Sequence, residues 1–154
     1  MLEFKKILFP IDLSETSPLL VDYVRVVAER FGAELHVVNV MREPLASTSG
    51  IDMSREELER IRSGVLAGAR AQLEDFAQKH FSGLSKVTTM QLRGDPSDEI
   101  LGYIRQHGIS LVVMGTHGRK GLDKIIFGSV AQRIVQMSPA PVMTINPYRI
   151  KQGS

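Results

Sequence analysis

The sequence predicts a single-domain α/β protein: an open five-stranded parallel sheet with helices on both faces. Short apolar segments alternate with amphipathic helical segments from end to end, which is typical of parallel strands joined by right-handed crossovers. The length of 154 residues, with 43% hydrophobic and 23% charged residues, suits one globular domain. Two chemically distinctive loops follow the first and fourth strand segments, and a 3-2-1-4-5 order would bring them together at the carboxyl ends of neighbouring strands.

The first strand and helix are predicted close to the N-terminus. Residues 6–9 form a short apolar run, which Pro10 is expected to end. Ser17 and Pro18 have the residue types of an N-cap and a first helical position. Gly32 is expected to end this helix. Its apolar stripe has helical spacing and consists of Leu20, Val24, Val27 and Phe31.

A second strand, a loop and a long helix follow. Residues 34–40 have the composition of a strand, and residues 41–52, rich in Ser, Thr, Pro and Gly, are expected to form a mobile loop. Residues 54–81 have the periodicity of an amphipathic helix that ends near Gly83. The stripe expected to face the core consists of Leu58, Ile61, Val65, Ala69, Leu73 and Phe76.

The C-terminal half is predicted to contain three further strands and two helices. Residues 86–92 form the third strand. Asp95 and Pro96 then open a short helix that Gly108 ends, again with the residue types of an N-cap, a first helical position and a C-terminal stop. The fourth strand, last helix and last strand are expected at residues 110–114, 129–137 and 141–145.

The loop after the fourth strand carries the most informative spacing, Gly115-x2-Gly118-x9-Gly128-Ser129. Glycine lets the backbone approach a ligand closely and adopt positive φ, so successive N–H groups can converge on an anion. A helix that begins near Ser129 adds free N–H donors and the positive end of its dipole. The spacing therefore predicts a phosphate site. One alternative stays open: the glycines only serve a long loop, and Ser129 is an N-cap with Gln132 as capping-box partner.

Composition restricts the classes of function. The formal net charge of +2 is too small to imply a nucleic-acid surface. The chain has no cysteine, which excludes thiolate chemistry and fits a cytoplasmic protein. Pro10 and Asp12 interrupt the N-terminal apolar run far short of a signal-peptide core, and we expect no membrane span. The four histidines lack metal-ligand spacing, so no dedicated metal site is expected.

Two groups of residues carry a wider resemblance. The first is Ile7-Leu8-Phe9-Pro10-Ile11-Asp12; the second runs from Val112 to Leu122 and continues with Gly128-Ser129-Val130-Ala131 and Pro139-Ala140-Pro141-Val142. They closely resemble the signatures of the universal stress protein family, specifically its nucleotide-binding branch. We therefore expect one universal stress protein domain at residues 1–146, followed by a C-terminal tail at 147–154. The resemblance also implies the 3-2-1-4-5 sheet, ATP binding and homodimerisation.

The resemblance assigns roles position by position. Asp12 corresponds to the carboxylate that holds the ribose, Pro10 and Ile11 contribute with it to one wall of the adenosine pocket, and Val40 corresponds to the position whose main chain reads adenine. The floor beneath the ribose and phosphates, and then the phosphate cradle, correspond to Met114, Gly115, Gly118, Arg119, Gly128, Ser129 and Val130. On the residues alone, capping of the first helix stays open as an alternative role for Asp12, and Val40 is a core or strand-end valine.

The resemblance thus implies an ATP-binding regulatory or stress-response protein that acts through protein partners yet unknown. The adenine nucleotide is expected to be ATP, with AMP and ADP as alternatives, and Mg²⁺ is expected to arrive with the nucleotide. A homodimer is expected through the last strand, Pro141 to Ile145, because an edge strand leaves N–H and C=O groups unpaired.

Other functions fit the sequence less well. A slow, Mg²⁺-dependent ATPase is the main alternative, but the chain has no G-x4-G-K-[ST] sequence and the glycine loop offers only Asp123 as a carboxylate. Hydrolysis is therefore expected to be weak at most. A receiver domain would need an acidic pair after the first strand and an acceptor Asp ending the third, and a dinucleotide-dependent oxidoreductase would need G-x-G-x-x-G after the first strand. The sequence has neither arrangement.

Overall fold

A computed structural model describes residues 1–43, 53–117 and 128–150. Within these ranges, five parallel strands form one sheet in the order β3-β2-β1-β4-β5. The strands are β1 (Lys6–Ile11), β2 (Glu34–Met41), β3 (Val87–Arg93), β4 (Leu111–Gly115) and β5 (Val142–Ile145). The helical segments are the 3₁₀ helix η1 (Ser17–Leu20), α1 (Val21–Phe31), α2 (Arg55–Phe81), α3 (Pro96–His107) and α4 (Ser129–Met137). The predicted fold class and strand order are confirmed.

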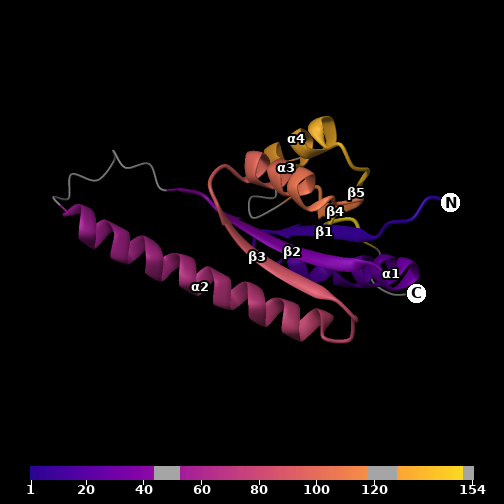
Figure 1. The fold of residues 1–154 in the computed structure, drawn as a ribbon, viewed down its shortest axis with the longest axis horizontal. Helices are drawn as coiled ribbons and strands as arrows, with labels where there is room; N and C mark the ends of the chain where they lie inside the picture. Colours follow the sequence, from indigo (N-terminus) through magenta and orange to yellow (C-terminus); the bar gives the residue numbers. More distant parts are fainter. Residues whose placement is uncertain (44–52, 118–127, 151–154) are drawn as a thin grey trace.

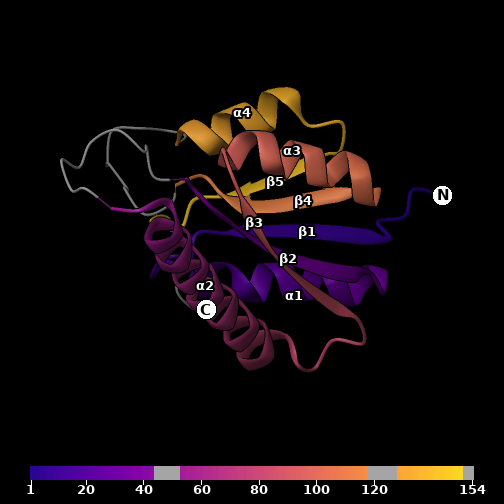
Figure 2. The same ribbon diagram turned by 60° about the vertical axis from the view of Figure 1, so that its left-hand side comes forward.

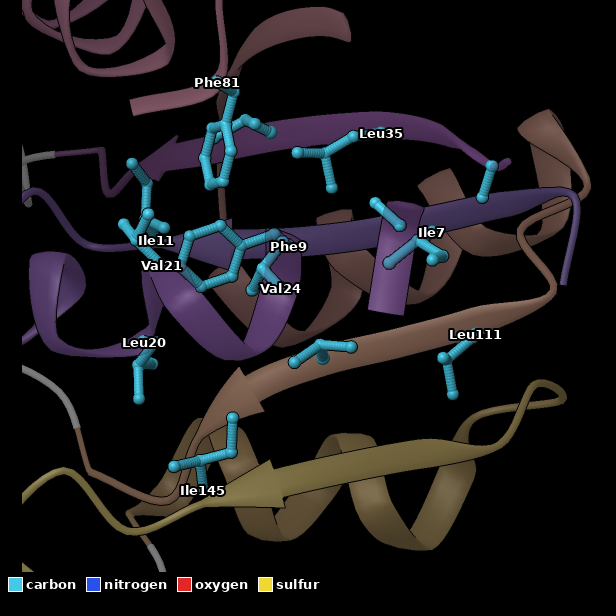
Figure 3. Close-up of a cluster of buried hydrophobic side chains, with 14 of the residues drawn as sticks. Ile7, Phe9, Ile11, Leu20, Val21, Val24, Leu35, Phe81, Leu111 and Ile145 are labelled. Atoms are coloured by element: carbon cyan, nitrogen blue, oxygen red, sulfur yellow. The ribbon is translucent and has the colours of Figure 1, made fainter. Parts of the chain in front are cut away.

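Helices α1 and α2 cover one face of the sheet, and α3 and α4 cover the other, as Figure 1 and Figure 2 show. Successive residues of a strand point to opposite faces, so each central strand contributes to two cores. On the α1 side, Phe9 meets Phe81 edge to face with ring centroids 6.0 Å apart, and Val24 lies in the same cluster (Figure 3). On the α3 side, Leu8 belongs to a second cluster with Ile104. Because both faces are covered, the central strands β1 and β4 are almost entirely apolar.

Strand β1 continues past Pro10, so the expectation that this proline ends the strand is wrong. The carbonyl of Lys5 accepts a hydrogen bond from β2, and the carbonyl of Lys6 accepts one from the residue before β4. Main-chain groups of β1 therefore point alternately to β2 and to β4, and Pro10 faces β4. Its missing N–H leaves the β1–β2 ladder intact as far as Ile11.

The first helical segment also begins differently from the prediction. Ser17 is not an N-cap: Thr16 holds that position, with no side-chain capping bond in the described part of the chain, and Ser17 and Pro18 lie within η1. Proline suits the first turn of a 3₁₀ helix for the same reasons as that of an α-helix, a fixed φ and an N–H that needs no partner. Helix α1 follows directly and ends at Gly32 with φ of 56°, as predicted.

Helix α2 begins with a capping box, in which the Ser54 Oγ accepts from the Glu57 N–H and the Glu57 carboxylate accepts from the Ser54 N–H. The predicted stripe is only partly right. Leu73 is fully buried, but Ile61 and Val65 are 50% and 55% exposed. The cause is length: 27 helical residues span about 40 Å, whereas the 7 residues of β3 span about 23 Å. The N-terminal half of α2 consequently extends beyond the sheet (Figure 1).

Some expectations fall partly outside the described residues. Met41 belongs to β2 rather than to the loop predicted for residues 41–52, and residues 44–52 lie outside the described ranges. Of the expected tail, residues 147–150 are described and 151–154 are not. In the described part of the chain, no helix has both the length and the apolar character needed to cross a membrane.

A buried polar cluster lies toward the amino ends of the strands. His36, 3% exposed, has Nε2 3.1 Å from Oε1 of Glu34 and Nδ1 2.6 Å from the hydroxyl oxygen of Tyr103. The ring of His107 stacks on Tyr103 with centroids 3.9 Å apart. Burial lowers the pKa of His36 below its ordinary 6.5; the nearby Glu34 carboxylate opposes this shift, and Lys6 and His107 add to it. His36 is therefore neutral in the folded protein near pH 7.

The free energy of unfolding is expected to decrease as the pH falls below about 6.5. Because the pKa of His36 is lower in the folded chain than in the unfolded chain, the unfolded chain takes up protons first and acid favours it. Urea unfolding at about pH 7.5 and about pH 5.5 measures the loss. Between these two pH values, the free energy of unfolding of a His36→Gln variant is expected to decrease less than that of the wild type. Part of the decrease is expected to remain in this variant, because burial also lowers the pKa of His80. Equal losses in wild type and His36→Gln would contradict the assignment.

Candidate functional site

The candidate site lies at the carboxyl edge of the sheet, where β1 and β4 are neighbours. The strand order reverses there, so α1 and α4 leave toward opposite faces. The β1–β4 ladder pairs Ile7 with Leu111 and Leu8 with Val112 and extends no further, although both strands continue. Pro10 faces β4 without an N–H to donate, which explains why the ladder stops. Open parallel sheets bind their ligands at such a boundary.

Asp12 follows β1 directly and is held in a tight turn. Its Oδ1 accepts from the Ser14 N–H at 3.0 Å and from the Ser17 hydroxyl at 3.4 Å. Leu13 between them has φ of 58°, a left-handed conformation that costs a non-glycine residue about 1 kcal/mol or more. The N-cap of η1 is Thr16, so the alternative that Asp12 caps the first helix is wrong. The carboxylate instead fixes the turn that carries it, at the end of β1.

A buried amide pair, which the sequence analysis missed, fixes the neighbouring strand ends. The Asn39 Nδ2 donates to the carbonyl of Ile11 at 2.8 Å, and the Gln91 Nε2 donates to the Asn39 Oδ1 at 2.8 Å. Asn39 is 6% exposed and interrupts the apolar run of β2, the one signal in the sequence that points to it. The pair joins β3, β2 and β1 immediately beside Val40 and Asp12. Val40 itself is half-buried and packs against the α3-side cluster.

Thr116, directly after β4, connects the elements on the β4 side of the site. Its N–H donates to the carbonyl of Ile145 in β5 at 2.9 Å, and its carbonyl accepts from the N–H of Gly128 at 2.7 Å. The end of β4, the end of β5 and the start of α4 are thus tied together at one residue.

Close packing, rather than left-handed backbone, accounts for the two described glycines of the motif. Neither has positive φ. A Cβ on Gly115 would lie 3.1 Å from a Leu20 methyl group and 3.2 Å from the carbonyl oxygen of His117. A Cβ on Gly128 would lie 3.4 Å from the carbonyl oxygen of Thr116, which is an ordinary contact. The sequence argument from positive φ is therefore wrong at both positions, and only Gly115 lacks room for a side chain.

Helix α4 begins at Ser129 with Gly128 as its N-cap, so the capping-box alternative for Ser129 and Gln132 is wrong. Gly128 has no side chain that accepts a hydrogen bond, and no other side chain in the described residues caps this helix. Among the described residues, no side chain accepts from the N–H groups of the first turn, Ser129 to Ala131, which form the positive end of the helix dipole. This arrangement suits an anion.

The structure brings most of the predicted site residues to this edge. The ends of β1 and β4 and the start of α4 carry Pro10, Ile11, Asp12, Met114, Gly115, Gly128, Ser129 and Val130. Val40 lies at the end of β2, one strand further. Gly118 and Arg119 lie outside the described residues. Among the residues that the structure describes, no group of three or more His, Asp or Glu side chains is arranged to hold a metal ion.

Comparison with known proteins decides the family. The model of the universal stress protein family matches residues 3–146. The chain belongs to the universal stress protein family. The resemblance found in the sequence is confirmed, and the carboxyl ends of β1 and β4, Asp12 and the start of α4 all lie within the matched region.

Individual relatives cover nearly the whole chain. The universal stress protein YxiE of Bacillus subtilis is 30% identical over 146 residues, covering 92% of this chain and 99% of YxiE. The universal stress protein MJ0577 of Methanocaldococcus jannaschii is 26% identical over 153 residues, covering 92% and 94%. Its solved structure matches with a TM-score of 0.80 at 25% identity, covering 99% of this chain and 100% of that one. A universal stress protein solved in complex with cAMP matches in fold, with a TM-score of 0.61 at 16% identity over 95% of this chain and 99% of that one.

Replacing Gly115 by Ala is expected to lower the free energy of unfolding by about 1–2 kcal/mol, because the new Cβ presses on a backbone oxygen and a buried Leu20 methyl group. Gly102 in α3 is the matched control. A Cβ there meets nothing within 4 Å, so Gly102→Ala is expected to be neutral or to stabilise by about 0.5–1 kcal/mol. Urea unfolding of both variants measures the difference. An unchanged stability of Gly115→Ala would contradict the packing requirement.

Proposed function

We propose that this universal stress protein binds an adenine nucleotide, ATP in the first place, at the carboxyl edge between β1 and β4. The bound nucleotide would control a regulatory or stress response. The observation that carries the proposal is the start of α4, which no side chain of the described residues caps, beside the carboxyl ends of β1 and β4, where their ladder has stopped. A phosphate group supplies acceptors for the N–H groups at this helix end. On the other side of the boundary, the Asp12 carboxylate supplies an acceptor for ribose hydroxyl groups.

The proposal also assigns contacts to the adenine ring, the phosphates and Mg²⁺. In the proposal, the main chain of Val40 reads the adenine edge, and Gly118 and Arg119 complete the phosphate cradle. Mg²⁺ arrives with the phosphates and keeps mostly phosphate and water ligands. The relative solved with cAMP binds an adenine nucleotide, which supports this class of ligand. We propose binding rather than rapid turnover, because the Asp12 Oδ1 already accepts two hydrogen bonds from its own turn.

A Ser129→Asp variant separates ligand binding from folding. A carboxylate in the first turn of a helix interacts favourably with the helix dipole, so the Tm of the ligand-free protein is expected to stay equal or rise. The same carboxylate repels phosphate, so ATP affinity is expected to fall at least about tenfold, roughly 1.4 kcal/mol. Titration calorimetry with ATP and Mg²⁺ measures the affinity, and thermal melts without ligand measure the fold.

Gln136→Glu is the matched control, because it adds the same charge to the exposed surface near the other end of α4. Salt screens the repulsion between this distant charge and the phosphates, so the ATP affinity is expected to stay within about twofold of wild type. A folded Ser129→Asp protein with unchanged ATP affinity would contradict the placement of the phosphate at the start of α4. Wild-type protein that binds no adenine nucleotide would overturn the proposal as a whole.

We also propose that the protein is a homodimer joined through β5, an edge strand of the sheet. The carbonyls of Pro141 and Ile145 accept hydrogen bonds from β4 and the residue after it. By strand alternation, Val142 and Thr144 point their main-chain N–H and C=O groups away from β4. A second copy of β5, related by a two-fold axis, can pair with these groups.

A Thr144→Pro variant is expected to be monomeric and folded. It removes an outward N–H and adds a ring at the open edge, while the β4–β5 ladder keeps all its donors. Sedimentation at roughly tens of micromolar, a range for weak two-fold contacts, measures the oligomeric state. Thr144→Val, which keeps the N–H, is expected to remain dimeric. A monomeric wild type, or a dimeric Thr144→Pro, would contradict the β5 interface.

A further inference from the structure

The segment after β5 is folded back onto the domain. Asn146 organises a turn, in which its Oδ1 accepts from the Tyr148 N–H at 3.0 Å and its carbonyl accepts from the Arg149 N–H at 3.1 Å. Pro147 is buried, and Ile150 packs against the apolar cluster on the α1 side of the sheet. The segment is therefore held at both ends, and Tyr148 between them has a fixed direction.

The ring of Tyr148 meets the ring of His117, which lies just after β4. The centroids are 5.9 Å apart and the planes are inclined by 66°, an edge-to-face geometry that attracts aromatic rings. His117 is only 8% exposed, and its Nδ1 is 2.8 Å from the hydroxyl of Thr116. Tyr148 keeps 50% of its surface exposed, so it covers His117 from the outside without belonging to either core.

The contact continues to the start of α4. Thr116, bonded to His117 through its side chain, accepts the Gly128 N–H at 2.7 Å through its carbonyl and donates to the end of β5. The carbonyl of His117 lies 3.2 Å from the position of a Cβ on Gly115. Thr116 and His117 thus set the separation between the end of β4 and the first turn of α4. Tyr148 contacts one of these two residues, His117, through its ring.

We propose that Asn146 to Ile150 form a brace for the nucleotide site, in which Tyr148 is a positioning residue that acts through His117 and Thr116 on the start of α4. The inference rests on the proposed nucleotide site and adds a control element to it. Coupling between two sites is reciprocal. Nucleotide binding stabilises the docked segment, and a protein partner that removes the segment from His117 weakens nucleotide binding.

Calorimetric titration with ATP and Mg²⁺ tests the brace in wild type and three variants. Tyr148→Ala removes the ring contact and is expected to weaken ATP binding roughly fivefold, in line with the strength of one aromatic pair. Tyr148→Phe keeps the ring and is expected to bind as wild type does. Tyr23→Ala removes another partly exposed aromatic side chain, on α1, and is expected to leave the affinity unchanged.

Amide hydrogen exchange supplies a readout that does not depend on the affinity. In ligand-free Tyr148→Ala, the N–H groups of Thr116 and Gly128 are expected to exchange faster than in wild type. In wild type, ATP is expected to slow exchange at Tyr148 and Arg149. Faster exchange in the interior strands β2, β1 and β4 as well would indicate general destabilisation and overturn the positioning role.

The outcomes distinguish the two proposals. Wild-type protein that binds ATP, together with Tyr148→Ala that binds it equally well, overturns the brace and leaves the nucleotide site intact. If Tyr148→Phe binds ATP as weakly as Tyr148→Ala does, the ring contact is not the cause of the weaker binding, and the brace is overturned. Wild-type protein that binds no adenine nucleotide overturns the proposed function, and the coupling with it.

Discussion

The geometry of the candidate site depends on a proline in the central strand. Pro10 lacks an N–H on the side of β1 that faces β4, so β1 stays paired with β2 along its length but loses β4 beyond Leu8. The β1–β4 ladder is therefore formed at its amino end and stops before the carboxyl ends of the two strands. The strand order reverses at the same boundary, and neither α1 nor α4 crosses it. One missing donor thus coincides with the place where the topology allows a ligand.

Hydrogen bonds and packing fix the chain on both sides of this boundary. The amide pair of Asn39 and Gln91 ties the ends of β1, β2 and β3 together on one side. On the other side, Thr116 ties β4, β5 and the start of α4, and the segment after β5 packs on its neighbour His117. Among the described residues, Leu13 is the one non-glycine residue with a left-handed backbone, and it turns the chain so that Asp12 stays at the end of β1. A site held in this way loses little conformational entropy when a ligand binds.

The sequence predicted what depends on local chemistry and periodicity. Apolar runs located the five strands, and Gly32, Gly108 and the Asp95-Pro96 pair located helix ends, because caps and left-handed glycines act within a few residues. Pro10 was misjudged because its effect depends on which neighbouring strand its missing N–H faces. The exposed half of the α2 stripe was misjudged because the length of β3 is a property of the whole sheet.

The site could be predicted only in part for the same reason. The motif residues follow strands, so their placement at one edge follows from strand order. The pairing of Asn39 with Gln91, 52 residues apart, and the docking of Tyr148 on His117 depend on tertiary packing, which no short-range pattern encodes. The alternatives for Asp12 and Ser129 as caps could be decided only when the helix starts were known, at Ser17 and Ser129.

The most direct test of the account is the map of backbone amide NMR shifts on addition of ATP and Mg²⁺. Binding at the β1–β4 boundary predicts that the amides of Asp12, Gly115, Ser129 and Val130 shift, because they line the ends of β1 and β4 and the start of α4. The amide of Glu34, at the opposite edge of the sheet, is predicted to stay unchanged. The absence of shifts, or shifts confined to the amino edge, would contradict the account.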